Sequence, residues 1–193
     1  MIPVTRKPEP DNFDRKVRQP GLRFLAENPQ PIRWQNREYW QQALSDMRHA
    51  YDSICAYCAT WIPHSTGSHS IDHFVPKSQA PWMAYEWDNY RYVSARFNNR
   101  KGTQTIVDPF ELSSDWFLLD FTSFLIHPNP ELSSAEKESI WQTIAILRLN
   151  DDEDLVVERQ TYFTDYQENQ TSFEHLQRRA PFIASELIRQ GYV

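Results

Sequence analysis

The sequence lacks any hydrophobic run long enough to cross a membrane, and the residues that follow Met1 lack the apolar stretch of a secretory signal. It has only two cysteines among 193 residues, Cys55 and Cys58, which argues against a structural disulfide framework. We therefore expect a cytoplasmic protein that does not contact membranes. With 40% hydrophobic and 14% aromatic residues, the chain can still bury the core of about one domain.

An excess of basic charge is also lacking, since 20 Lys and Arg residues face 26 Asp and Glu residues. Proteins that hold DNA unaided usually present a basic surface that neutralises phosphates. The charge is unevenly placed, however: residues 1–24 have six basic and three acidic residues, residues 70–102 have five and three, and acids gather around residues 151–154. We expect a local basic groove inside an acidic protein, and weak DNA binding by the chain alone.

The proline and apolar patterns predict an α+β, mostly helical fold in three segments. Residues 1–34 contain six prolines among charges and are expected to form an extended arm. Apolar residues at helical spacing predict a helix over 35–52 within a core of residues 35–110. Residues 111–193 are expected to be helical and to pack on the core or dock a partner.

Three signals mark the helices of that last segment. Ser133 and Glu136 form an S-x-x-E capping box, and the Asn-Asp-Asp run at residues 150–152 starts a second helix. A last helix is expected over about residues 172–190, with a kink or break at Pro181 and a stop at Gly191.

The residues that carry chemistry lie in the middle of the chain. Residues 70–78 read Ser-Ile-Asp-His-Phe-Val-Pro-Lys-Ser, residues 87–93 read Trp-Asp-Asn-Tyr-Arg-Tyr-Val, and residues 97–102 read Phe-Asn-Asn-Arg-Lys-Gly. An Asp-His pair, a Pro-Lys turn, an Asn sixteen residues after the His and an N-x-x-K-G nine residues further on resemble the HNH nuclease family. The resemblance covers about residues 55–102, and an ordered set of spaced elements is more specific than any one dipeptide.

The resemblance implies a ββα-metal core surrounded by helices, with a two-stranded hairpin over about residues 70–76 and 90–93 and a helix over about residues 94–102. It implies an endonuclease that hydrolyses phosphodiester bonds of DNA. The nuclease interpretation depends on the spacing of all these motifs together. An isolated Asp-His is usually a surface pair, and an isolated Asn-Asn is usually a turn.

The same residues make chemical sense for such a reaction. His73 has the intrinsic pKa of a general base that takes a proton from water, and the side-chain carbonyl of Asn89 can orient its ring. Asp72 and Asn98 supply hard oxygen donors for one Mg²⁺ or Mn²⁺ ion. Lys101, one helical turn after Asn98, can contact a phosphate oxygen or the backbone of the motif.

Four further basic residues are candidates for phosphate contacts. They are Lys77, Arg91, Arg96 and Arg100. For each arginine by itself, a solvated position on the surface explains the sequence equally well.

The cysteines depart from the family pattern. Many proteins of this type carry a second C-x-x-C that completes a four-cysteine zinc site, but Ser94 and Phe97 stand at those positions here. Cys55 and Cys58 are then a buried relic or half of a different site. His64 and His69 follow at spacings that a Cys₂His₂ site allows, although neither matches the family pattern. We do not expect structural zinc.

The outer regions carry a weaker resemblance. The Arg-Lys-Pro-Glu-Pro arm and the Leu-Asn-Asp start of a late helix resemble the small HNH proteins of bacterial anti-phage defence systems of the Septu type. That resemblance implies an ATPase partner subunit, which would hold the DNA that the acidic chain binds weakly. Two alternatives remain open: an RNA- or tRNA-cleaving nuclease, and a non-catalytic binding subunit of a nuclease–ATPase complex.

Overall fold

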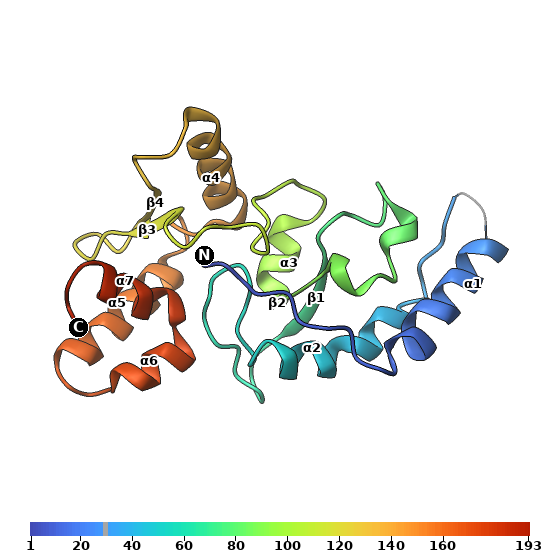
Figure 1. The fold of residues 1–193 in the computed structure, drawn as a ribbon, viewed down its shortest axis with the longest axis horizontal. Coiled ribbons are helices and arrows are strands. Elements are labelled where there is room, and N and C mark those ends of the chain that lie inside the picture. Colours follow the sequence, from blue (N-terminus) through green and yellow to red (C-terminus); the bar gives the residue numbers. More distant parts are fainter. Residues whose placement is uncertain (29–30) are drawn as a thin grey trace. The chain divides into compact units, whose positions relative to one another are not determined.

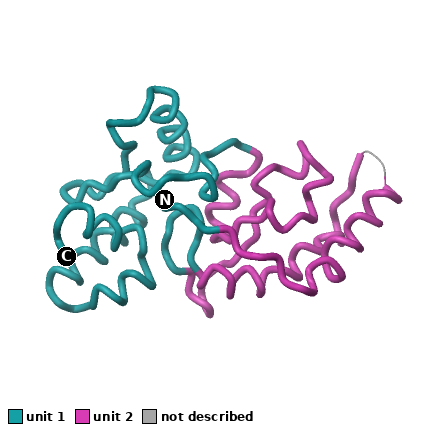
Figure 2. The backbone as a smooth tube through the Cα atoms, viewed as in Figure 1, with its two compact units in different colours: residues 1–5, 54–61, 104–193 teal, residues 6–53, 62–103 magenta. Residues whose placement is uncertain are grey.

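The computed structural model describes residues 1–28 and 31–193, and this part of the chain forms an α+β fold. It contains seven α-helices and two antiparallel sheets of two strands each. The backbone separates into two compact units (Figures 1 and 2). Unit 1 comprises residues 1–5, 54–61 and 104–193, and unit 2 comprises residues 6–53 and 62–103. The expected α+β class is confirmed, whereas the units are interleaved along the chain rather than consecutive.

The N-terminal segment is the first correction. It is not an extended arm throughout, because residues 14–27 are helical: η1 (Asp14–Arg18) is a π-helix that leads into α1 (Gln19–Glu27). Pro20 lies in the first turn of α1, and the backbone N–H of Gln19 donates to Asp14 five residues earlier. The wider turn accommodates a proline, which lacks an N–H and would clash inside a regular helix. Pro29 and Gln30, also in the predicted arm, lie outside the described residues.

Unit 2 continues with η2 (Tyr39–Ala43), a 3₁₀ helix, and α2 (Leu44–Ala50). The helix expected over 35–52 is therefore present in part, with a 3₁₀ first half and an α-helical second half. Trp40, Ala43 and Met47 are buried, which accounts for the apolar spacing in the sequence.

A hairpin and a helix form the centre of unit 2. β1 (His69–His73) pairs antiparallel with β2 (Tyr90–Ser94), with Asp72 opposite Arg91, and α3 (Ala95–Lys101) follows directly. Two short 3₁₀ helices, η3 (Pro81–Met83) and η4 (Trp87–Asn89), lie in the connection between the strands. α3 ends where Gly102 adopts a φ of +53°, which a residue without a Cβ adopts readily. The expected hairpin and helix are present within a few residues.

Aromatic side chains fill the core of unit 2. Helix α1 packs against them so closely that a Cβ added at Gly21 would lie 2.1 Å from Cγ of Tyr85. Several rings lie edge-on or tilted to one another at centroid distances of about 5–6 Å, an arrangement that stabilises aromatic pairs. These rings belong to Phe13, Trp34, Trp40, Tyr85, Trp87 and Tyr90.

Unit 1 is mainly helical, with a short hairpin of β3 (Phe117–Leu119) and β4 (Ile126–Pro128). The sequence pattern did not predict these two strands of three residues each. The helices are α4 (Ser134–Leu147), α5 (Glu153–Gln167), α6 (Phe173–Arg179) and α7 (Pro181–Arg189).

The two helix-end signals predicted for unit 1, the capping box and the break at Pro181, are present in the structure. The Ser133 hydroxyl accepts from the Glu136 backbone N–H while the Glu136 carboxylate accepts from the Ser133 backbone N–H, so the capping box is confirmed. The predicted break at Pro181 is also confirmed, since α6 ends before it and α7 begins with it. None of the helices in the described residues is both long and apolar enough to cross a membrane.

Candidate active site

Four of the residues predicted to do chemistry line one pocket in unit 2. Its volume is about 310 Å³. Asp72 and His73 reach it from the end of β1, Lys77 from the turn that follows, and Asn98 from α3. The remaining wall residues are Trp34, Pro76, Ser78, Gly102 and Thr103. The pocket therefore joins residues that lie up to 69 positions apart in the sequence.

His73 has the tautomer and charge of a general base. Its Nε2 lies 2.9 Å from the backbone carbonyl oxygen of Ala84, and because a carbonyl only accepts, Nε2 carries the proton. Nδ1 then holds the lone pair. Burial, and next the positive charge of Lys77, lower the pKa of His73 to about 3. The ring is therefore neutral at pH 7.

Asn89 does not orient His73 directly, which corrects the sequence prediction. Its side-chain Oδ1 accepts from the backbone N–H of Val75 at 2.8 Å, while Nδ2 donates to the carbonyls of Val75 at 3.0 Å and Met83 at 3.1 Å. Only 2% of Asn89 is exposed. Because Met83 directly precedes Ala84, the hydrogen bond from Asn89 fixes the backbone next to the carbonyl to which His73 donates.

Lys101 forms an ion pair with Asp72 rather than a contact with solvent. Its Nζ lies 3.1 Å from Oδ2 and 3.3 Å from Oδ1 of Asp72, and 3.3 Å from the backbone carbonyl of His73. Lys101 is fully buried and Asp72 is 3% exposed. Of the two contacts predicted for Lys101, the structure shows the one with the backbone of the motif, at the His73 carbonyl.

Asn98 lines the pocket, and its side-chain NH₂ group is used for hydrogen bonds within the fold. Its Nδ2 donates to the Ser70 hydroxyl at 2.7 Å and to the Ile71 backbone carbonyl at 3.0 Å. Since a carbonyl acceptor requires the NH₂ group on that side, Oδ1 is the atom left for a ligand. Asp72 and Asn98 thus bring one carboxylate and one amide oxygen to the same cavity.

Lys77 lies over two indole rings. Its Nζ is 3.9 Å from the ring centroid of Trp40 and 5.4 Å from that of Trp34, distances typical of cation–π contacts. Burial lowers the pKa of Lys77 from its usual value, while Glu38 and Asp72 oppose this shift. The ring of Trp40 also meets His73 edge-on, at a centroid distance of 4.7 Å. Trp40 therefore contacts both the cation and the imidazole.

The structure places the three arginines that were predicted to contact phosphate in different surroundings. Arg91 is only 3% exposed, and its guanidinium donates to the backbone carbonyls of Asp88 and Tyr90, so it stabilises the hairpin and is not placed to bind phosphate. Arg96 is exposed on α3, and Arg100 is half-buried beside Phe97. Neither lines the pocket, so their contact with nucleic acid stays a prediction.

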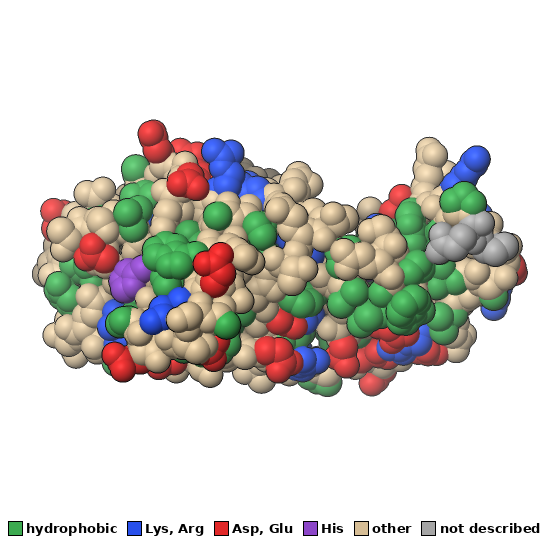
Figure 3. All heavy atoms as spheres, turned by 90° about the horizontal axis from the view of Figure 1, so that it is seen from above, with side chains coloured by type: hydrophobic (Ala, Val, Ile, Leu, Met, Phe, Trp, Pro, Cys, Tyr) green, Lys and Arg blue, Asp and Glu red, His purple; other side chains and the backbone are tan. Residues whose placement is uncertain are grey.

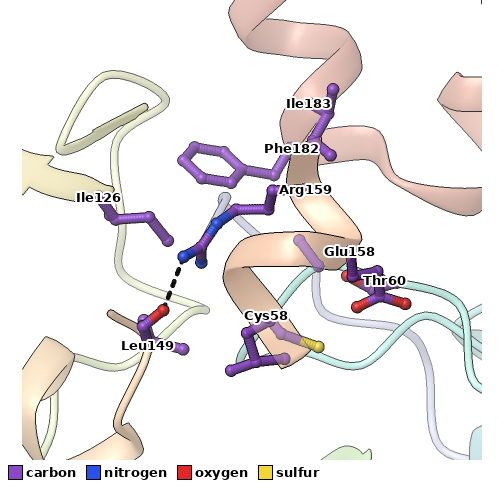
Figure 4. A pocket seen from close by; sticks show the side chains of 10 residues that line it. Cys58, Thr60, Ile126, Leu149, Glu158, Arg159, Phe182 and Ile183 are labelled. Atoms are coloured by element: carbon purple, nitrogen blue, oxygen red, sulfur yellow. Dashed lines mark hydrogen bonds between the residues drawn. The ribbon is translucent and has the colours of Figure 1, made fainter. Parts of the chain in front are cut away.

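The two cysteines belong to unit 1, whereas the residues that line the pocket belong to unit 2. The hydrogen bond with Cys55 and burial raise the pKa of the Cys58 thiol well above its usual value. The adjacent cavity has a volume of only about 10 Å³, room for a single water molecule (Figure 4). There the guanidinium of Arg159 donates to the Leu149 carbonyl at 2.8 Å.

The two histidines proposed to complete a zinc site have other partners in unit 2. Nε2 of His64 lies 2.9 Å from the Ser53 hydroxyl, and Nδ1 of His69 hydrogen-bonds with the Tyr92 hydroxyl. Across residues 1–28 and 31–193, no three His, Cys, Asp or Glu side chains gather into a group that could hold a metal ion. Any metal at the pocket would thus depend on an amide oxygen as well as a carboxylate.

The charges separate between the units. Unit 2 has 14 Lys and Arg against 10 Asp and Glu residues, a net charge of +4, and unit 1 has 6 against 16, a net charge of −10. These add to the −6 of the whole chain. The unit that contains the pocket is therefore basic, which answers much of the objection raised by the acidic composition.

Unit 2 also exposes apolar surface. On the face shown in Figure 3, hydrophobic side chains gather toward the end that holds α1. Within the described part of unit 2, the large hydrophobic side chains that are most exposed are Trp82, at 66%, and Leu22, at 44%. Trp82 does not line the pocket.

Sequence reasoning missed Trp34, Trp40 and the Ala84 carbonyl. Trp40 lies in the predicted helix over 35–52, but helical spacing only marks it as a core residue. The position of a backbone carbonyl cannot be predicted from the residue types of the sequence. These three contacts depend on tertiary packing.

Comparisons with known proteins identify no family. No protein-family model matches the chain, and no curated protein matches it. The functional assignment therefore depends on the geometry and chemistry of unit 2.

Proposed function

We propose that the chain is a metal-dependent endonuclease of the HNH type that hydrolyses phosphodiester bonds of DNA at the pocket of unit 2. The observation that carries this proposal is the convergence of Asp72, His73, Lys77 and Asn98 on one cavity, where His73 is a neutral imidazole whose Nε2–H donates to the Ala84 carbonyl. β1, β2 and α3 then correspond to the two strands and helix of a ββα-metal core.

The donors suit a hard divalent cation. Mg²⁺ keeps several water ligands and is often held by one or two carboxylates together with substrate phosphate. Asp72 and Asn98 would hold it, and a carboxylate has lone pairs enough to accept from Lys101 and still bind a cation. The cation would supply neutralisation of phosphate charge and stabilisation of the leaving oxygen.

The residues of the chain supply the remaining functions. His73 accepts the proton of the attacking water at Nδ1, while its Nε2–H is held by the Ala84 carbonyl. Asn89 fixes that carbonyl through Met83. Lys77, whose ammonium lies at the pocket wall, supplies positive charge for a phosphate oxygen.

A plasmid-nicking assay with purified full-length chain tests the proposal. Wild type should cut with Mg²⁺ or Mn²⁺ and stop in EDTA, and His73→Ala should lose at least 100-fold in rate, the lower bound of general-base catalysis. The matched control is His69→Ala, which removes a histidine from the same strand outside the pocket. Full activity of His73→Ala, or equal loss in both variants, would refute the assigned base. An RNA of the same sequence is assayed beside the DNA, and faster cleavage of the RNA would favour the alternative of an RNA-cleaving nuclease.

A partner subunit remains part of the proposal. Unit 1, with a net charge of −10, is poorly suited to bind DNA and is the surface where a partner that holds DNA would dock. The test is co-purification of the native chain, followed by the nicking assay with and without the co-purifying protein. A rate that the partner does not change would refute a role for the partner in cleavage.

A further inference from the structure

The pocket is larger than a bare phosphate requires. A volume of about 310 Å³ lies at the lower end of the range for sites that bind whole small molecules. Hydrolysis of a phosphodiester needs the phosphate with its two ester oxygens, the attacking water and a hydrated cation near His73. The remaining space must accommodate another part of the substrate or solvent.

Part of the pocket wall is a tryptophan side chain. Trp34 lines the cavity and is half-buried, so part of its surface faces the space beside the catalytic residues. Aromatic rings on such surfaces bind nucleobases by stacking, and they do so with little dependence on the base.

The indole is held firmly from behind. Its ring centroid lies 6.1 Å from those of Phe24 and Trp40 and 6.2 Å from that of Tyr85. Lys77 lies 5.4 Å from the same ring. A side chain fixed by three aromatic neighbours loses little conformational entropy when a base stacks on it. The same lysine lines the pocket together with Asp72, His73 and Asn98.

A base that lies against this wall cannot remain in a duplex. In double-stranded DNA the bases are stacked and paired inside the helix, and extruding one costs a few kcal/mol. In a single strand that cost is largely absent.

From these observations we infer that the pocket binds one unpaired nucleotide, with its base against Trp34 and its phosphate at Asp72, His73 and Asn98, so that the preferred substrate is single-stranded DNA. The inference rests on the proposed function and specifies its substrate. Trp34 is the residue that determines the preference.

Fluorescence anisotropy with a labelled oligonucleotide tests this inference on the full chain carrying His73→Ala, in Mg²⁺. Single-stranded DNA should bind more tightly than the matched duplex. Adding Trp34→Leu should weaken single-strand binding by roughly 5- to 150-fold, as expected for loss of one stacked base, and Trp34→Phe should retain most of it. Trp82→Leu is the matched control, because Trp82 is exposed and does not line the pocket.

A second measurement does not depend on whether the Trp34 variants fold. An oligonucleotide with abasic nucleotides should bind the chain with intact Trp34 as weakly as the normal oligonucleotide binds Trp34→Leu. Equal binding of the abasic and normal strands, or of duplex and single strand, would overturn the inference. Tighter binding of an RNA of the same sequence would overturn the choice of DNA.

Cleavage by the wild-type chain separates the two proposals. Base-dependent single-strand binding without any metal-dependent cleavage would refute the nuclease while leaving the nucleotide pocket supported. Cleavage that is equally fast on abasic, duplex and single-stranded substrates would refute the nucleotide pocket while leaving the nuclease supported.

Discussion

Replacing Lys101 by methionine tests how strongly the buried ion pair stabilises unit 2. The change keeps the length of the side chain and removes its charge, leaving the Asp72 carboxylate 3% exposed without its cation. At the Nζ–Oδ2 distance of 3.1 Å, the Coulomb energy at an effective dielectric constant near 20 is about 5 kcal/mol. Removing one partner of a buried pair usually costs about 3–5 kcal/mol. We expect the free energy of unfolding to fall by that amount.

Urea denaturation in EDTA, followed by tryptophan fluorescence, measures the loss. Asp72→Asn should destabilise by a similar amount, because it leaves the Lys101 ammonium buried and unpaired. The double variant should lose less than the sum of the two single losses, by about 2 kcal/mol or more. Hydrogen exchange at the amides of β1 and β2 should increase in the single variants, which locates the effect in unit 2.

The matched control is the pair of Glu174 and Arg178, which has the same N–O distance of 3.1 Å but side chains 76% and 66% exposed. Its coupling should be only about 0.3–0.5 kcal/mol. Mg²⁺ should stabilise Lys101→Met more than wild type, because the Lys101 ammonium no longer competes with the cation for the Asp72 carboxylate. Losses in the double variant that simply add, or a Lys101→Met chain within about 1 kcal/mol of wild type, would refute the reasoning.

Three further outcomes are expected from the geometry of unit 2. Asn89→Ala should lower the free energy of unfolding by about 2–3 kcal/mol, because it leaves backbone groups such as the Val75 N–H without their partner. Gly21→Ala should destabilise by about 1–3 kcal/mol, although alanine normally favours a helix, because its Cβ would overlap the Tyr85 ring. The free energy of unfolding of wild type should fall by about 2 kcal/mol between pH 7 and pH 5 because of His73. Below pH 6.5 the His73 side chain binds a proton in the unfolded chain. In the folded chain, where its pKa is about 3, it does not.

Each of these outcomes has a direct check. Chemical denaturation measures the first two, with Tyr85→Leu as the variant that should restore tolerance to Gly21→Ala. A stabilised Gly21→Ala chain would contradict the close approach of α1. Denaturation in EDTA across the pH range measures the third, with His73→Gln as the control whose stability should fall less on acidification. If the free energy of unfolding fell equally with pH in wild type and in His73→Gln, His73 would not be a buried neutral imidazole.

Local sequence signals determined much of the secondary structure. The resemblance to the HNH family implied a hairpin and a helix, and β1, β2 and α3 lie there within a few residues. The capping box and the break at Pro181 were also predictable, because each depends on residues within one turn of the helix end. Such signals act between neighbours in the chain, so the sequence contains them directly.

The prediction made from local signals was wrong for the N-terminal segment. Prolines and charges predicted an extended arm, yet Phe13, Val17 and Phe24 are buried and residues 14–27 are helical. Burial of these apolar side chains outweighed the local cost of Pro20, and a π-helical turn removed the steric conflict. Propensity is a weak guide where tertiary packing supplies more free energy.

For the candidate site, the sequence by itself determined which chemical groups are present: a carboxylate, an imidazole, two amides and two lysines at fixed intervals. Only the tertiary structure decided what each one does. It turned Lys101 inward to Asp72, joined Asn89 to the backbone at Met83 rather than to His73, and brought Trp34 into the pocket from far along the chain. The reason is physical: spacing fixes which residues share a strand or a helix face, whereas burial, hydrogen-bond partners and the shape of a cavity arise between elements that the sequence places far apart.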